Sequence, residues 1–290
     1  MMPSVELVAD IPCEVGENPL WHPRERCLYW CDIPRGRLYR HDPATKTTAM
    51  VRDGVRDGNA IGGFTIQQDD ALLLFMNGGC VKRWSHDGET TVLAGIKREE
   101  KSRFNDVIAN SLGQVFCGTM TYEKQPGRLY RFDPDGTLHT IIESVGCPNG
   151  MAFSRDGRCF FFTDSFAHSV YRFDYDQSTG HCSNQQLWLK TDAKDGYPDG
   201  ITIDAEGCCW IAHWNGSCVT RYSLDACEIL RVPVPTAKVA SVTFGGEDLK
   251  TLFITTAGGE VRQKGANQLA GSLFKFHAPA AGVAEYRSGR

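Results

Sequence analysis

A short strand-like phrase recurs six times along the chain. Its clearest copy is Gly127-Arg-Leu-Tyr-Arg-Phe-Asp-Pro134, where a small residue is followed by alternating polar and apolar side chains. The apolar residue after the small one stands at Leu38, Val81, Leu129, Val170, Val219 and Leu273, which are 43, 48, 41, 49 and 54 residues apart. Such a period in a strand-rich chain is typical of a β-propeller, which builds one small antiparallel sheet per repeat.

A second repeat runs in register with the first. Residues 149–163 have the pattern of strand, tight turn and strand, with Ser-Arg-Asp-Gly in the turn. Equivalent hairpins begin at Glu17, Gly62, Asn105, Asn149, Asp199 and Ala240. The phrase follows each hairpin as a third strand, and we expect fourth, outer strands at 47–51, 90–94, 138–142, 186–190 and 229–232. The sequence therefore predicts an all-β fold, a six-bladed β-propeller with four-stranded blades around a central channel.

The unbroken repeat predicts that residues 1–290 form a single propeller domain. Ring closure requires one blade to borrow a strand from the opposite terminus, and residues 5–9 beside 272–276 would supply it. Closure also removes exposed sheet edges, which otherwise invite aggregation. The longest interruption of the pattern is 257–271, which is rich in Gly and polar residues and is expected to be a binding loop or a mobile segment.

Composition narrows the classes of partner. A net charge of −4 and a pI of about 6.1 argue against nucleic-acid binding. No apolar run approaches the ~18 residues of a membrane span, and the N-terminus lacks the pattern of a signal peptide. Seven of the twelve cysteines lie in apolar strand-like runs and no CxxC pair occurs, so we expect a reduced cytoplasmic protein rather than a disulfide framework. The basic run at 97–103 is expected to be mostly a solvated loop.

The first residues of the six hairpins should form one ring around the channel. Four of the six carry side-chain oxygens, namely Glu17, Asn105, Asn149 and Asp199. Converging carboxylate and amide oxygens suit Ca²⁺, Mg²⁺ or Mn²⁺, and Zn²⁺ also accepts carboxylates. For any one residue alone, turn chemistry at Asn-Gly or Asp-Gly is the stronger explanation. The shared register reverses that preference, because Glu17 precedes no such turn signal yet falls on the same ring.

Other catalytic patterns have little support. No GxSxG elbow or Gly-rich phosphate loop occurs, and the histidines lack HxH and HExxH spacing. We expect His213 to be a packed residue at a strand end. Arg103 and Glu123 lie near the ring in sequence, but spacing alone favours a solvated basic residue and an ordinary loop carboxylate.

Several motifs together resemble the regucalcin/gluconolactonase family of sugar-lactone hydrolases. They are Gly16-Glu-Asn-Pro-Leu-Trp21, Arg103-Phe-Asn-Asp106, Gly118-Thr-Met120, Pro148-Asn-Gly150 and Tyr197-Pro-Asp-Gly200. The likeness extends from about Leu7 to Phe276 and implies a six-bladed propeller with a divalent ion in its channel. It implies that Glu17, Asn149 and Asp199 are metal ligands and that Asp199 is also the general base. It further implies that Arg103, Asn105 and Glu123 bind substrate. For Arg103 and Glu123, substrate binding is then preferred over a solvated basic residue and an ordinary loop carboxylate.

The resemblance leads us to expect a metal-dependent lactonase that opens a sugar lactone, specifically an aldonolactone, to its acid. Departures at Val107, which follows Asp106, and in the 257–271 loop leave the identity of the lactone open. Two alternatives stay open, a phosphotriesterase-like hydrolase and a non-catalytic calcium-binding or interaction propeller. The metal and the oligomeric state are not determined by the sequence.

Overall fold

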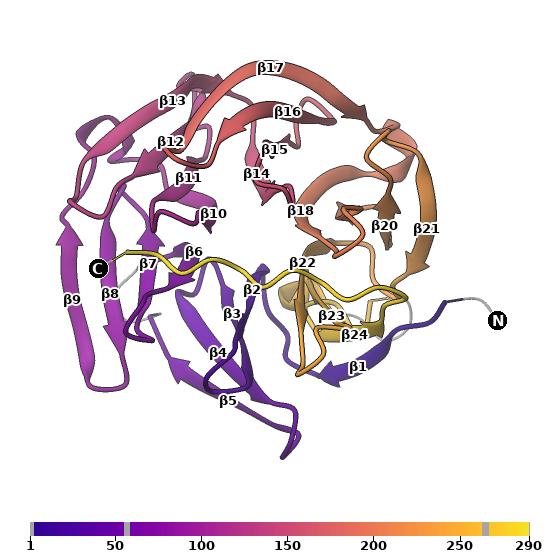
Figure 1. Ribbon diagram of the computed structural model, residues 1–290. Helices are drawn as coiled ribbons and strands as arrows, with labels where there is room; N and C mark the ends of the chain where they lie inside the picture. The colour runs from indigo at the N-terminus through magenta and orange to yellow at the C-terminus, as the bar shows by residue number, and fades with distance from the viewer. Residues whose placement is uncertain (1–2, 55–58, 263–266, 290) are drawn as a thin grey trace.

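Six four-stranded antiparallel sheets surround a common centre in the computed structural model (Figure 1), which describes residues 3–54, 59–262 and 267–289. The predicted six-bladed β-propeller is therefore confirmed. From inside outwards, blade 1 consists of β2 (Gly16–His22), β3 (Cys27–Asp32), β4 (Arg37–Asp42) and β5 (Thr47–Arg52). Blade 2 consists of β6 (Ile61–Ile66), β7 (Leu72–Met76), β8 (Val81–Ser85) and β9 (Gly88–Leu93). Blade 3 consists of β10 (Phe104–Ala109), β11 (Val115–Thr119), β12 (Gly127–Phe132) and β13 (Leu138–Val145).

The other three blades follow the same order. Blade 4 consists of β14 (Pro148–Phe153), β15 (Cys159–Asp164), β16 (Ser169–Asp176) and β17 (His181–Lys190). Blade 5 consists of β18 (Tyr197–Ile203), β19 (Cys209–Trp214), β20 (Cys218–Tyr222) and β21 (Glu228–Pro233). Blade 6 consists of β22 (Val239–Gly245), β23 (Thr251–Thr256), β24 (Leu273–His277) and β1 (Glu6–Ala9). The expected fourth strands are all present, and β13 and β17 are several residues longer than expected.

The N-terminal strand β1 is the fourth strand of blade 6. β1 pairs antiparallel with β24, so that Glu6 lies opposite Lys275 and Leu7 opposite Phe274. β1 thus covers the outer edge of blade 6, whose other three strands come from the C-terminal part of the chain. This non-local pairing joins the two ends of the chain into one sheet.

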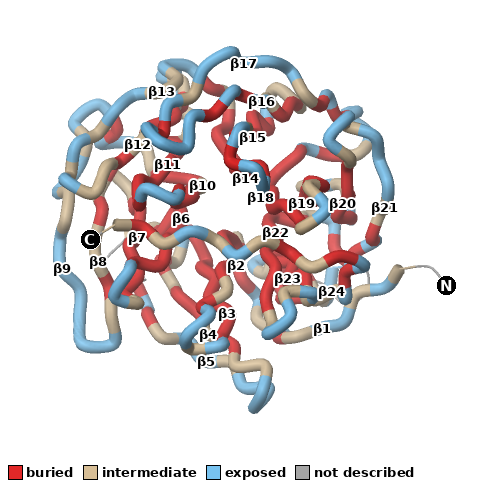
Figure 2. The backbone as a smooth tube through the Cα atoms, in the orientation of Figure 1, coloured by how far each residue is buried: buried red, intermediate tan, exposed pale blue. Residues whose placement is uncertain are grey.

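The apolar core lies between neighbouring blades. Inner strands such as β6 are buried along their whole length, whereas outer strands such as β17 are mostly exposed (Figure 2). Between blades 3 and 4, the ring of Phe116 packs against Phe153 and Phe160 at centroid distances of 5.7 and 4.9 Å. Each such buried side chain contributes about 1.5–3 kcal/mol, so inter-blade packing holds the inner strands in fixed relative positions.

Every inner strand carries an irregularity at the same end. The register with the second strand shifts between Glu17 and Leu20, and equivalent shifts follow Ile61, Phe104, Asn149, Pro198 and Val239. A β-bulge re-aims side chains that would otherwise alternate across the sheet. The six bulges therefore turn the predicted ring residues toward one end of the channel.

The Asn-Gly and Asp-Gly pairs of the ring lie within strands and not in turns. Gly150 is in β14 and Gly200 is in β18. A Cβ at Gly150 would stand 2.4 Å from the backbone oxygen of Asp199, and one at Gly200 would stand 2.1 Å from Oγ of Ser241. Glycine at these positions lets the inner strands of adjacent blades approach closely, which overrides the turn interpretation.

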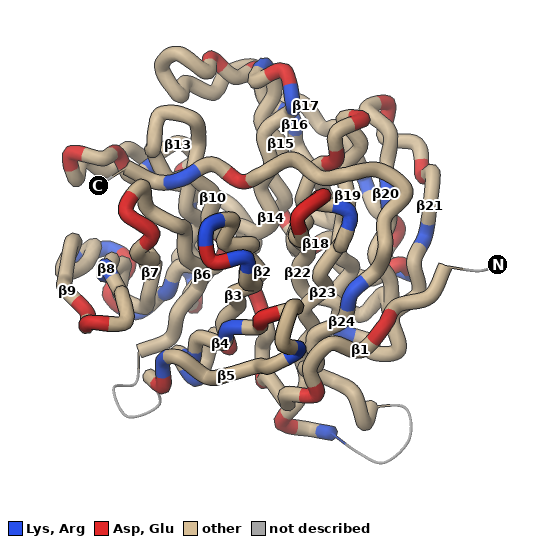
Figure 3. The backbone as a smooth tube through the Cα atoms, turned by 60° about the horizontal axis from the view of Figure 1, so that its bottom comes forward, with Lys and Arg blue, Asp and Glu red and all other residues tan. Residues whose placement is uncertain are grey.

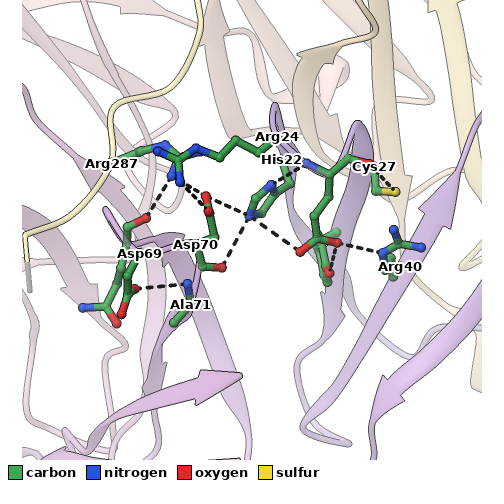
Figure 4. A network of polar contacts seen from close by, with 11 residues as sticks. His22, Arg24, Cys27, Arg40, Asp69, Asp70, Ala71 and Arg287 are labelled. Atoms are coloured by element: carbon green, nitrogen blue, oxygen red, sulfur yellow. Dashed lines mark hydrogen bonds and ion pairs between the residues drawn. The ribbon is translucent and has the colours of Figure 1, made fainter. Parts of the chain in front are cut away.

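The C-terminal segment, residues 278–289, crosses the channel (Figure 1). It does so at the end away from the ring residues. Backbone nitrogens of Val283, Ser288 and Gly289 donate to Ile203, Ile66 and Gly113, which belong to three different blades or their loops. Arg287 and Arg24 both reach the carboxylate of Asp70, at 2.5 and 2.7 Å (Figure 4). The segment therefore ties several blades together at the end away from the ring residues.

The remaining features agree in part with the expectations. All twelve cysteines are free. Within the described ranges, no helix is long and apolar enough to span a membrane. Basic and acidic residues are interspersed along the backbone (Figure 3). In the 97–103 run, Lys97 and Arg98 are exposed as expected, but Glu99 is buried and accepts hydrogen bonds from Arg128 and Tyr130.

The 257–271 loop is only partly covered, because 263–266 lie outside the described residues. The described part is anchored to its surroundings. Gly259–Val261 forms a short 3₁₀ turn, and the guanidinium of Arg262 donates to Asp10, Ala270 and Ser272.

Candidate active site and cation site

The bulged ends of the inner strands surround a cavity of about 380 Å³, a size that suits a small ligand. It is lined by Val15, Glu17, Arg103, Asn105, Met120, Cys147, Asn149, Ser165, Phe166, Tyr197, Asp199 and Trp214. All four predicted oxygen-bearing ring residues are among them, as is Arg103. These residues come from different blades and lie far apart in the sequence. The fold brings them together around one cavity.

Glu17 and Asp199 are two buried carboxyl groups in this cavity, 7% and 3% exposed. Burial raises the pKa of Glu17 above its usual range, and the charge of Asp106 adds to the effect. Burial also raises the pKa of Asp199 well above its usual range, reinforced by Glu17 and Asp106 and opposed by the Asn149 amide and Arg103. Oδ1 of Asp199 is buried and has no hydrogen-bond partner among the described residues.

These observations fit a bound cation. Unpaired buried negative charge is costly, and a cation between the carboxylates would remove that cost. Within residues 3–54, 59–262 and 267–289, no three His, Cys, Asp or Glu side chains form a metal-binding group. The candidate ligand set is therefore two carboxylates and the Asn149 amide, and hard cations prefer such oxygen donors.

The Asn149 amide is anchored through Ser165. Nδ2 of Asn149 donates to Oγ of Ser165 at 3.1 Å, and that hydroxyl donates to the backbone oxygen of Pro198 at 2.7 Å. No hydrogen bond to Oδ1 of Asn149 is found in the part of the chain that the structure describes. This oxygen belongs to a residue that lines the cavity, so it is available to a ligand there.

Arg103 and Asn105 form a polar wall of the cavity. Nη1 of Arg103 donates to the backbone oxygen of Phe104 and to Oδ1 of Asn105, at 2.8 and 2.7 Å. Nδ2 of Asn105 donates to the backbone oxygen of Pro148 at 2.8 Å. Burial lowers the pKa of the Arg103 guanidinium, and no carboxylate forms an ion pair with it among the described residues. Its remaining donors can therefore serve a ligand.

Glu123 does not line the cavity. It occupies a two-residue turn between Tyr122 and Gln125, with φ of +52°, and its side chain is exposed. The turn begins three residues after Met120, which does line the cavity. Glu123 therefore lies within about 10 Å of chain from the cavity wall, outside the cavity itself.

The sequence interpretation missed most of the cavity wall. Cys147, Ser165 and Phe166 lie at strand ends and in the connections of blade 4, where no repeat position marks them. Trp214 ends β19 beside His213, which is fully buried as expected, and burial lowers the pKa of that imidazole to about 4. Met120 and Tyr197 belong to motifs that the sequence analysis singled out, but nothing in their spacing indicated that they line the cavity.

A second, smaller cavity lies farther along the channel. Its lining includes Asn18, Asp106 and, from the C-terminal segment, Glu285. Burial raises the pKa of Asp106 to about 6 and that of Glu285 to about 7, with the charge of Asp106 also raising the latter. Acidic side chains therefore line both cavities of the channel.

Comparisons with known proteins show to which family the chain belongs. A family model described as "SMP-30/Gluconolactonase/LRE-like region" matches residues 15–258. The chain is 44% identical to pentonolactonase XacC of Haloferax volcanii over 98% of both chains, and 32% identical to regucalcin of Bos taurus over 94% of both. A solved calcium-binding regucalcin of Agrobacterium tumefaciens superposes with a TM-score of 0.90 at 23% identity, covering 100% of this chain and 98% of the other, which supports the fold alone.

Proposed function

Because the chain belongs to the SMP-30/gluconolactonase/LRE-like family, we propose that it is a lactonase that hydrolyses a sugar lactone to the corresponding sugar acid. The observation that carries the proposal is the pair of buried carboxyl groups, Glu17 and Asp199, which line one cavity together with Arg103. The resemblance to a pentonolactonase over nearly the whole chain makes a five-carbon aldonolactone the first substrate to test.

Glu17, Asn149 and Asp199 would hold one divalent cation, for which Ca²⁺, Zn²⁺, Mn²⁺ and Mg²⁺ are the candidates. When bound, the cation would polarise the lactone carbonyl and stabilise negative charge on its oxygen. The residues around it have separate tasks. Glu17 balances the charge of the cation, and Asn149 supplies a neutral oxygen.

Asp199 would act as the general base. Its carboxyl is buried and is partnered only in part, so it can accept a proton from a water molecule that attacks the lactone carbonyl. Water adds to the carbonyl carbon, the ring C–O bond breaks, and the proton passes to the ring oxygen that leaves as a hydroxyl. The product is a hydroxy acid that releases one proton at neutral pH.

Arg103 and Asn105 would orient the substrate. Their donors line the polar side of the cavity, and fixed hydrogen bonds to sugar hydroxyls place the carbonyl for attack. An apolar lactone would offer the partly buried Arg103 and the buried Asn105 no hydrogen-bond partner, which would disfavour its binding. Glu123 is exposed and does not line the cavity, so it could contact only a part of a substrate that projects out of the cavity.

The test is proton release from pentono- and hexonolactones by chelated protein, with Ca²⁺, Zn²⁺, Mn²⁺ or Mg²⁺ added back singly. We expect at least one ion to restore turnover and Asp199→Asn to lower it by ~10²–10⁴-fold, the usual contribution of a general base. Asp192→Asn is the matched control, because Asp192 caps the short turn just before β18 and is outside the cavity.

Three outcomes separate the alternatives. Turnover of Asp199→Asn equal to wild type would remove Asp199 from the mechanism. Faster hydrolysis of a phosphotriester than of any lactone would favour a phosphotriesterase-like enzyme. Ion binding without hydrolysis of either class would favour a non-catalytic calcium-binding propeller.

A further inference from the structure

A short hydrogen-bond relay connects blades 4 and 5 in the wall of the cavity. Asn149 in β14 donates to Ser165, and Ser165 donates to the backbone oxygen of Pro198 in β18. The side chains of Asn149 and Ser165 are 6% and 4% exposed, so water does not substitute freely for either contact. Ser165 has no part in the function proposed above.

The chemistry of the relay allows only one direction. A backbone carbonyl can only accept a hydrogen bond, so Ser165 must use its single hydroxyl proton on Pro198. The Ser165 oxygen can then only accept from Asn149, and Asn149 must present its NH₂ group to it. Oδ1 of Asn149 is thereby placed on the other side of the amide.

This direction matters because a cation needs an oxygen ligand. The Asn149 amide also opposes the rise in the pKa of Asp199, so its NH₂ group serves both Ser165 and that carboxyl. A cation that neutralised Asp199 would compete with the second of these contacts, and the hydrogen bond to Ser165 would then hold the NH₂ group away from the cation. A turned amide would offer a cation two hydrogens in place of an oxygen ligand.

The same relay connects two candidate ligands through the backbone. Pro198 directly precedes Asp199, so Ser165 joins the Asn149 side chain to the strand position that supplies the next ligand. One blade earlier, Nδ2 of Asn105 donates directly to the backbone oxygen of Pro148, which directly precedes Asn149. From blade 3 to blade 5, each amide thus donates in the same direction around the ring, and Ser165 completes the second step.

We propose that Ser165 is a positioning residue that fixes the orientation of the Asn149 amide and so keeps Oδ1 available as a cation ligand. The ligand role of Asn149 rests on the proposed function. The amide orientation itself rests only on the hydrogen bonds of the relay, so the two can be tested separately.

Calcium binding to the chelated full-length protein, measured by calorimetric titration with Ca²⁺ alone, tests the effect on the site. Ser165→Ala should weaken binding by ~10–100-fold, the usual loss when an outer-shell partner is removed. Ser165→Thr keeps the hydroxyl and should restore most of the affinity. Ser169→Ala is the matched control, because Ser169 is a buried serine of the same blade that donates to a backbone carbonyl, Ala167, outside the cavity.

A double-variant cycle separates orientation from general loosening of the site. In an Asn149→Ala background, Ser165→Ala should cause no further loss of Ca²⁺ affinity if Ser165 acts through the Asn149 amide. A further loss as large as in the wild-type background would overturn the proposal. So would wild-type affinity in a folded Ser165→Ala protein.

A second measurement needs no metal. In chelated protein labelled with ¹⁵N-asparagine, the side-chain amide protons of Asn149, assigned with Asn149→Ala, should exchange slowly in wild type and in Ser165→Thr. They should exchange markedly faster in Ser165→Ala. Equal exchange in all three proteins would refute the relay even if Ca²⁺ binds. Protected exchange in a wild-type protein that binds no cation would keep the positioning role and refute the proposed metal function instead.

Discussion

At the scale of single residues, the sequence could predict only those site residues that occupy a repeated position in a strand. Glu17, Asn149 and Asp199 were found by counting, because each occupies the same place in a repeated hairpin and a bulge turns it toward the channel. Ser165 and Phe166 could not be found in this way. They follow the second strand of a blade, in a connection whose length and sequence differ from blade to blade.

Arg103 offers a test at this scale. Its Nη1 joins the backbone of Phe104 to Asn105, and its remaining donors have no carboxylate partner among the described residues. Arg103→Met should lower kcat/KM by about 10–150-fold, the equivalent of ~1.5–3 kcal/mol for charged hydrogen bonds. Arg103→Lys should recover part of this, because it keeps the charge but loses the planar fork.

Steady-state kinetics on the best lactone substrate would measure these changes, with Arg155→Met as the control. Arg155 is on the surface and donates to the backbone of Ala205, away from the cavity. If Arg103→Met kept both kcat and KM, the guanidinium would have no contact with the substrate.

At the scale of elements, regular strands were predictable and irregular segments were not. Hydrophobic alternation and turn residues located all six hairpins, because those patterns act locally. The 278–289 segment lacks periodicity, and its course across the channel depends on backbone bonds to Ile66, Gly113 and Ile203, which are distant in sequence. The burial of Glu99 was missed for a similar reason, since Glu99 ends a short 3₁₀ helix and its partners Arg128 and Tyr130 lie 29 and 31 residues away, in β12.

Closure by β1 gives the element-scale prediction. Deleting residues 1–9 would leave the outer edge of β24 unpaired and would expose apolar side chains such as Leu273, which is 1% exposed. Burying one such side chain is worth about 1.5–3 kcal/mol, so Tm should fall by roughly 2–5 °C in a chain of 290 residues. The open edge should also promote association.

Differential scanning calorimetry and light scattering would follow both effects. Deleting residues 1–4 is the matched control, because β1 begins at Glu6. A protein without residues 1–9 that melted like the control and stayed monodisperse would show that pairing at this edge adds little to stability.

At the scale of the whole molecule, the propeller concentrates negative charge on its own axis. Glu17, Asp106, Asp199 and Glu285 come from three blades and the C-terminal segment, and burial raises the pKa of each. Ring closure and inter-blade packing prevent these groups from moving apart. Stability of the metal-free fold is therefore coupled to pH and to cations.

The sign of that coupling follows from the raised pKa values. In the unfolded chain these carboxyls titrate near pH 4, whereas the folded state keeps them protonated to higher pH. Between those limits the folded state binds more protons, so the free energy of unfolding should decrease as pH rises from about 5 to about 8. Ca²⁺ should oppose the decrease, because it stabilises the ionised forms of Glu17 and Asp199, by about 2.7 kcal/mol at 100 times its Kd.

Denaturant unfolding at three pH values, in chelator and in Ca²⁺, would measure this coupling, with Glu17→Gln as the diagnostic variant. Removing one titrating carboxyl should flatten the pH dependence in chelator and reduce the stabilisation by Ca²⁺. Glu260→Gln, on the 257–271 loop away from both channel cavities, should change neither. If Glu17→Gln and wild type lost stability in parallel as pH rose, Glu17 would not be a source of the dependence, because its carboxyl would then titrate in the folded state as it does in the unfolded chain.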